Sequence, residues 1–174
     1  MEMAQKAGVG ERHGVDYGAW ARSGLVAGLI AGISFALFEM IVAAVIAGDF
    51  FGPLRMISGV VLGQQALTPE VSLGLAAAVG VAVHMVYSLL AGVVFALIIA
   101  AVGAFHSSRA SVIVTASVLG LLMWILNFYI IAPAAGWSWF PQRASQFWQG
   151  FVAHTFLYGS VSGWYLAAAR VGKR

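Results

Sequence analysis

Four long runs of hydrophobic residues dominate the chain, and short segments with glycine, proline or polar residues separate them. The runs cover Trp20–Ala47, Ser72–Ala101, Ala110–Ala132 and Ser145–Ala169. A helix needs about 20 mostly apolar residues to cross the hydrocarbon core of a bilayer, and each run is long enough. The pattern therefore predicts an all-α, polytopic integral membrane protein whose four helices form one bundle.

The same pattern divides the chain into five segments. They are an N-terminal segment at 1–19, a first helix pair at 20–101, a loop at 102–109, a second helix pair at 110–169 and a basic tail at 170–174. Within the first pair, apolar side chains recur through residues 53–67, which predicts a short interfacial or re-entrant helix on the outer surface.

Composition supports the membrane assignment and excludes several functions. Hydrophobic residues make up 61% of the 174 residues and charged residues only 9%, whereas a soluble domain carries about a quarter charged residues. The chain has no cysteine, so disulfides and thioether-linked haem are excluded, and any cofactor would be held non-covalently. The net charge of +3 is not gathered into a basic run, which argues against nucleic acid as a partner.

The positions of the basic residues predict the orientation in the membrane. Seven of the nine lie on the side that holds both termini and the 102–109 loop, and only Arg55 and Arg143 lie on the other side. Because cytoplasmic segments carry the excess of lysine and arginine, both termini are expected in the cytoplasm. A bacterial-type inner membrane fits this arrangement, and the two longer loops would then face outward.

An internal repeat relates the two helix pairs. At an offset of 88 residues the matching pairs are Gly32 with Gly120, Glu39 with Asn127, Pro53 with Pro141 and Arg55 with Arg143. At an offset of 70 residues, Gly80 matches Gly150 and His84 matches His154. Since each unit holds two helices, both would insert in the same direction, and a pseudo-two-fold axis along the membrane normal should relate them.

Four polar residues lie inside the expected spans, and all four share a helix face with small residues. They are Glu39, His84, Asn127 and His154, and Tyr87 and Trp124 lie on the same faces. Polar residues within a span usually face the bundle interior, and small residues mark where helices approach one another. We therefore expect one inward-facing polar cluster in the outer half of the membrane.

Two histidines related by a two-fold axis suggest a cofactor. His84 and His154 could ligate the iron of haem b from opposite sides, with Arg55 and Arg143 paired to its propionates. The same histidines with Glu39 could instead bind a transition metal. On this interpretation the protein is a small subunit or cofactor-bearing element of a membrane assembly, with a possible role in electron transfer.

Three alternatives use the same residues differently. In a purely structural accessory subunit, Glu39 would hydrogen-bond His84 and Asn127 would hydrogen-bond His154, each pair holding one repeat together. In a proton, ion or small-molecule transporter, the glutamate and the histidines would act as relay groups. In a third alternative, the cluster lines a quinone or lipid pocket.

No nucleophile–base pair, phosphate-binding glycine loop or carboxylate pair is present, so catalytic activity of the chain itself is not expected. The expected partners are the lipid bilayer and either other membrane subunits or further copies of the chain.

Overall fold

The computed structural model describes residues 14–140 and 147–170, and its regular secondary structure is all helical, as the sequence predicts. Among the described residues, three helices are long and apolar enough to cross a membrane. They are α1 (Tyr17–Ala47), α3 (Leu73–Ala101) and the helix that begins as α4 (Arg109–Ile125) and reaches Ala134. The first three expected spans thus correspond to these helices.

The last helical region consists of three consecutive elements: α6 (Phe147–Val152), the π-helix η5 (Ala153–Ser160) and α7 (Val161–Arg170). It covers most of the fourth expected span. It is not one of the three long apolar helices, because polar residues such as His154 and Thr155 interrupt its apolar sequence. A second π-helix, η3 (Leu126–Ile131), joins α4 to α5 (Ala132–Ala134).

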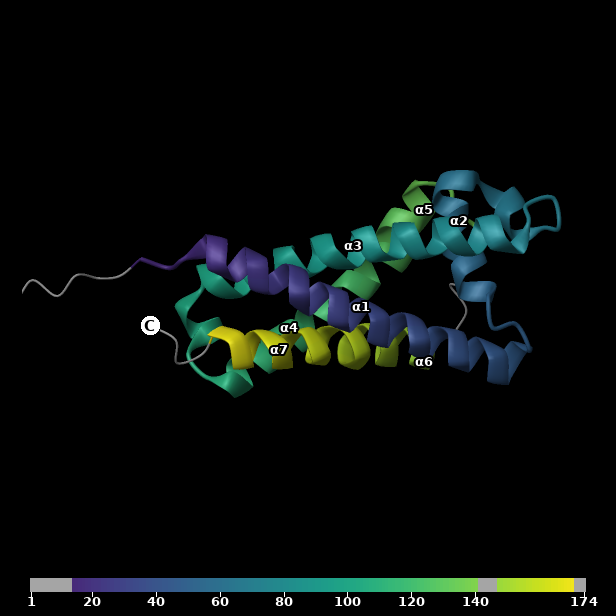
Figure 1. Ribbon diagram of the computed structural model, residues 1–174. Coiled ribbons are helices and arrows are strands. Elements are labelled where there is room, and N and C mark those ends of the chain that lie inside the picture. The colour runs from purple at the N-terminus through teal and green to yellow at the C-terminus, as the bar shows by residue number, and fades with distance from the viewer. Residues whose placement is uncertain (1–13, 141–146, 171–174) are drawn as a thin grey trace, which may run out of the picture.

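The helices pack mainly in pairs. α1 packs along α3, and α4 packs along η5 and α7, while α1 also contacts α7 and η5 (Figure 1). The first residues of α1 and the last residues of α7 lie at the same end of the molecule, and α2 (Gly52–Leu62) lies at the opposite end. The 102–109 loop contains a short 3-10 helix, η2 (Gly103–His106).

The helix expected near 53–67 is shorter than predicted. α2 ends at Leu62 because Gly63 follows with a φ of 78°, and the 3-10 turn η1 (Gln64–Leu67) completes the segment. α2 lies against α3 at Gly80, where an added Cβ would overlap the carbonyl oxygen of Leu54. Gly80 is about 10 Å along α3 from its first residue, so α2 folds back along α3.

The backbones of α1 and α3 are in direct contact at a series of glycines. A Cβ on Gly24 would lie 2.6 Å from the carbonyl oxygen of Gly92, and one on Gly92 would lie 2.6 Å from the Cα atom of Gly28. In the second helix pair, a Cβ on Gly159 would lie 2.7 Å from the carbonyl oxygen of Ala116. Small residues permit this close approach in both pairs.

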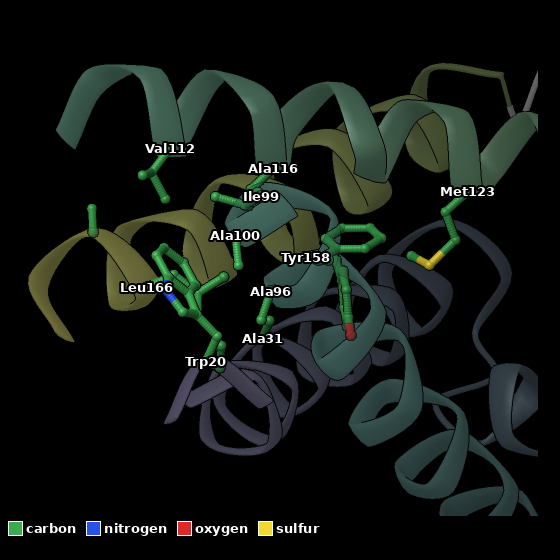
Figure 2. Close-up of a cluster of buried hydrophobic side chains, with 13 residues drawn as sticks. Trp20, Ala31, Ala96, Ile99, Ala100, Val112, Ala116, Met123, Tyr158 and Leu166 are labelled. Carbon is green, nitrogen blue, oxygen red and sulfur yellow. The ribbon is translucent and has the colours of Figure 1, made fainter. Parts of the chain in front are cut away.

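Buried apolar side chains fill one half of the molecule, which we call the packed half. It holds the chain-terminal ends of α1 and α7, and its buried side chains come from α1, α3, α4, η5 and α7 (Figure 2). The cluster comprises Trp20, Ala27, Ala31, Phe95, Ala96, Ile99, Ala100, Val112, Ala116, Met123, Tyr158, Leu166 and Ala167. We call the opposite half, which holds residues 35–47 of α1, the loop that follows and α2, the hollow half.

Large apolar side chains also cover the outside of the molecule. Val45 on α1 is 80% exposed, Leu90 on α3 61% and Val114 on α4 63%. A soluble protein rarely exposes so much continuous apolar surface, whereas a surface in contact with lipid is expected to be of this kind.

Gly92→Ala should destabilise the protein, because the new Cβ would overlap the backbone of α1. Overpacking of this kind costs about 1–3 kcal/mol. Unfolding by sodium dodecyl sulfate from a mild detergent, followed by circular dichroism, measures the loss. Gly74→Ala is the matched control in α3, since a Cβ at Gly74 meets nothing within 4 Å. Equal stability of the two variants would contradict the direct backbone contact.

Candidate functional site

A cavity of about 570 Å³ occupies the hollow half. Residues of α1, α2, α3, η3, α6 and η5 line it, so both helix pairs contribute to its wall. Sites for small molecules are typically concave and of roughly 300–1,000 Å³, with mostly apolar walls and a few placed polar groups. The cavity has both the size and the composition of such a site.

Aromatic rings form much of the cavity wall. They belong to Phe35, Tyr87, Trp124, Phe128, Tyr129, Trp137, Phe140 and Tyr158. Tyr158 is 2% exposed and belongs to the buried cluster as well, and its hydroxyl donates a hydrogen bond to the carbonyl oxygen of Ser88. Tyr158 therefore forms the floor that separates the cavity from the packed half.

The structure brings the polar residues singled out in the sequence to this one cavity. Glu39, His84, Asn127 and His154 all line it, together with Tyr87 and Trp124. His84 and His154 are 8% and 5% exposed, so their rings are enclosed by protein.

Hydrogen bonds join the two helix pairs, and the pairing expected within each repeat is wrong. Gln149 Nε2 of the second pair donates to Glu39 Oε2 of the first. The Tyr87 hydroxyl of the first pair donates to Asn127 Oδ1 of the second, at 2.9 Å. The reason is that α1 packs not only on α3 but also on η5 and α7, which turns its polar face toward the second helix pair.

Each histidine has one ring nitrogen bound to a backbone carbonyl. His84 Nε2 lies 2.9 Å from the carbonyl oxygen of Gly32, and His154 Nδ1 lies 2.9 Å from that of Gly150. A carbonyl oxygen only accepts, so the nitrogen carries the proton in both cases. The neutral rings are consequently opposite tautomers, with the free lone pair on Nδ1 of His84 and on Nε2 of His154.

The ring of Phe35 lies between the two imidazoles. It stacks on His84 with ring centroids 5.5 Å apart at 26°, and it meets His154 edge-on at 4.7 Å and 82°. Phe128 contacts His154 from another side, at 5.5 Å. A haem ligated by both histidines would have to displace the Phe35 ring. Among the described residues, no three His, Asp or Glu side chains come together to hold a metal ion.

Arg55 has a role in the connecting segment. Its Nη1 donates to the carbonyl oxygens of Ala66, Thr68 and Val71 at 2.8, 3.2 and 3.1 Å, and the residue does not line the cavity. These bonds hold the η1 turn against α2. Arg143, the matching residue of the second repeat, lies outside the described residues.

Three cavity residues were missed by the sequence reasoning. Phe35 lies one helical turn before Glu39 and therefore on its face, so the period of the helix could have identified it. Gln149 adjoins the repeat residue Gly150, and Asp49 follows Gly48, at which α1 ends. Neither position indicates in the sequence that the side chain lines a cavity.

No protein-family model, curated protein or solved structure matches the chain. Its function therefore has to follow from the chemistry of the cavity itself, in which neutral polar groups, carboxylates and aromatic rings face a space large enough for a small molecule.

The two histidines should give different nitrogen-15 spectra, because His84 carries its proton on Nε2 and His154 on Nδ1. Solid-state NMR of protein with labelled histidine, reconstituted in lipid, distinguishes the two tautomers. Because the chain has four histidines, His84→Gln and His154→Gln each remove one set of signals and together assign the two cavity histidines. The same tautomer at both positions would contradict the carbonyl bonds to Gly32 and Gly150.

Proposed function

We propose that this chain is a four-helix membrane protein that binds a small, mostly apolar molecule with aromatic or other ring character. The observation that carries the proposal is the cavity of about 570 Å³, lined by polar groups of both helix pairs and closed on one side by the packed half. Aromatic walls with a few hydrogen-bonding groups suit a molecule that is apolar apart from one polar group.

Three observations support the membrane arrangement that the proposal assumes. The helical run from α6 to α7 packs along α4 in the way that α3 packs along α1, which suits a fourth span. Glycines mediate close contact in both pairs, and the matching positions 39 and 127 each bond to the other pair. These features favour two repeats about a pseudo-two-fold axis, and the excess of basic residues puts the hollow half on the outer side of a bacterial-type inner membrane.

The surrounding lipid is the proposed source of the ligand. Tyr87 of α3 and Tyr129 of η3 line the cavity and are 43% and 47% exposed, so the cavity wall is accessible at these two side chains. In this proposal, a ligand dissolved in the bilayer reaches the cavity between them, past the hydrogen bond between Tyr87 and Asn127.

The packed half makes binding a better proposal than passage across the membrane. Below Tyr158, the described residues bury an apolar cluster (Figure 2), and the polar side chains buried beside it are hydroxyls such as those of Ser23 and Ser162. No buried carboxylate or histidine among the described residues continues a proton path from the cavity through this part. We propose that the protein holds its ligand for other membrane subunits, or for further copies of the chain, as an element of an assembly.

Filling the cavity should abolish ligand binding. Ala43 lines the cavity, so Ala43→Phe would occupy part of its volume, whereas Ala82→Phe on the exposed face of α3 is the matched control. The probe is a neutral phenyldiazirine, photoactivated in proteoliposomes and located by mass spectrometry. Labelling of η3 and η5 should saturate in the unmodified protein and in Ala82→Phe, and it should fall several-fold in Ala43→Phe.

Labelling that rises linearly with probe concentration at every position would contradict a binding site. An absorption spectrum and a metal analysis of the purified protein test the alternative that the cavity holds haem or a metal ion. A Soret band, or stoichiometric metal, that is lost in His154→Ala would replace the proposed ligand with haem or metal.

A further inference from the structure

The charged groups on the cavity wall are all acidic among the described residues. Glu39 and Asp49 line the cavity, and no lysine or arginine does so within residues 14–140 and 147–170. Glu39 lies near the middle of the lining segment of α1, and Asp49 lies just after the helix, at the end of the molecule that holds α2.

Glu39 receives a hydrogen bond from a neutral partner rather than from a cation. Its Oε2 accepts from the side-chain amide of Gln149, which leaves Oε1 available. A carboxylate at membrane depth is costly unless a positive charge or further donors compensate it. A cationic group in the cavity would supply that compensation.

The cavity also offers acceptors for the donors that a ligand brings. The free lone pairs of His84 Nδ1 and His154 Nε2 can accept a hydrogen bond, as can the side-chain oxygen of Gln149. Donors line the cavity as well, among them the side-chain NH₂ of Asn127, the hydroxyl of Tyr129 and the indole N–H of Trp137. The charge of the carboxylates, rather than the balance of donors and acceptors, therefore favours a cationic ligand.

Aromatic rings complete the complementarity. Trp124 and Trp137 line the same cavity as Glu39, with further rings around them. The faces of such rings attract cations, and quaternary ammonium groups are commonly held in aromatic cages.

We propose that the cavity selects an amphiphilic cation, an apolar molecule with one amine or quaternary ammonium group, with Glu39 as its counter-charge. This inference rests on the proposed ligand-binding function and names the chemical class of the ligand. Asp49 adds a second negative charge to the wall of the same cavity.

Two isosteric competitors test the charge separately from the shape. Phenyltrimethylammonium and tert-butylbenzene differ in one central atom and its charge. Each competes with the phenyldiazirine for the cavity in proteoliposomes of zwitterionic phosphatidylcholine. Partitioning of each competitor into lipid is the same for every variant, so the ratio between variants reports the protein alone.

Glu39→Gln should raise the concentration of phenyltrimethylammonium needed for half-competition by about tenfold, and that of tert-butylbenzene by less than about twofold. The change keeps the size of the side chain and a hydrogen-bonding partner for Gln149. Asp49 is exposed, so Asp49→Asn should raise the concentration of phenyltrimethylammonium needed for half-competition by a smaller factor. Glu70→Gln, a carboxylate outside the cavity, is the matched control and should change neither value.

The possible failures are distinguishable. Equal changes for both competitors in Glu39→Gln would overturn the inference while leaving a saturable binding site, and hence the proposed function, intact. The absence of saturable labelling in the unmodified protein would overturn the proposed function and this inference with it.

Discussion

Direct contact between the backbones of α1 and α3 is the constraint on which the rest of the structure depends. Gly24 and Gly28 meet Gly92 with no side chain between them. Two straight helices in such close contact must separate as they extend away from the crossing, and α1 and α3 diverge toward the end that holds α2 (Figure 1). The space that opens there is partly filled by α2, and the remainder is the cavity.

The sequence was sufficient for the three long apolar helices and for the helix faces on which the polar groups lie, because both follow from period and length. Residues such as Glu39 and His154 share a helix face with glycines, and faces with small residues turn inward. The sequence was not sufficient to identify the residues to which these polar groups hydrogen-bond. Periodicity defines the face of a helix but not which helix lies opposite, so Gln149 as the partner of Glu39 depended on how α1 packs on η5.

The two proposed repeats differ where their matching polar residues lie. Asn127 and His154 belong to the π-helices η3 and η5, whereas Glu39 and His84 belong to α1 and α3, which are regular α-helices. A π-turn inserts an extra residue into a helix and often persists at functional sites. Repeat spacing alone could not reveal this difference, because it depends on the backbone geometry of each helix rather than on residue type.

The close glycine contact also makes α1 a lever. The distance along the helix from Gly28, at the crossing, to Ala47 is about 28 Å, whereas the distance from Gly28 to Trp20 is about 12 Å. A rotation of α1 by roughly 5° about the crossing would therefore move its cavity end by about 2.5 Å and its end in the packed half by about 1 Å. Any such rotation would change the width of the cavity more than it disturbs the buried cluster at the opposite end.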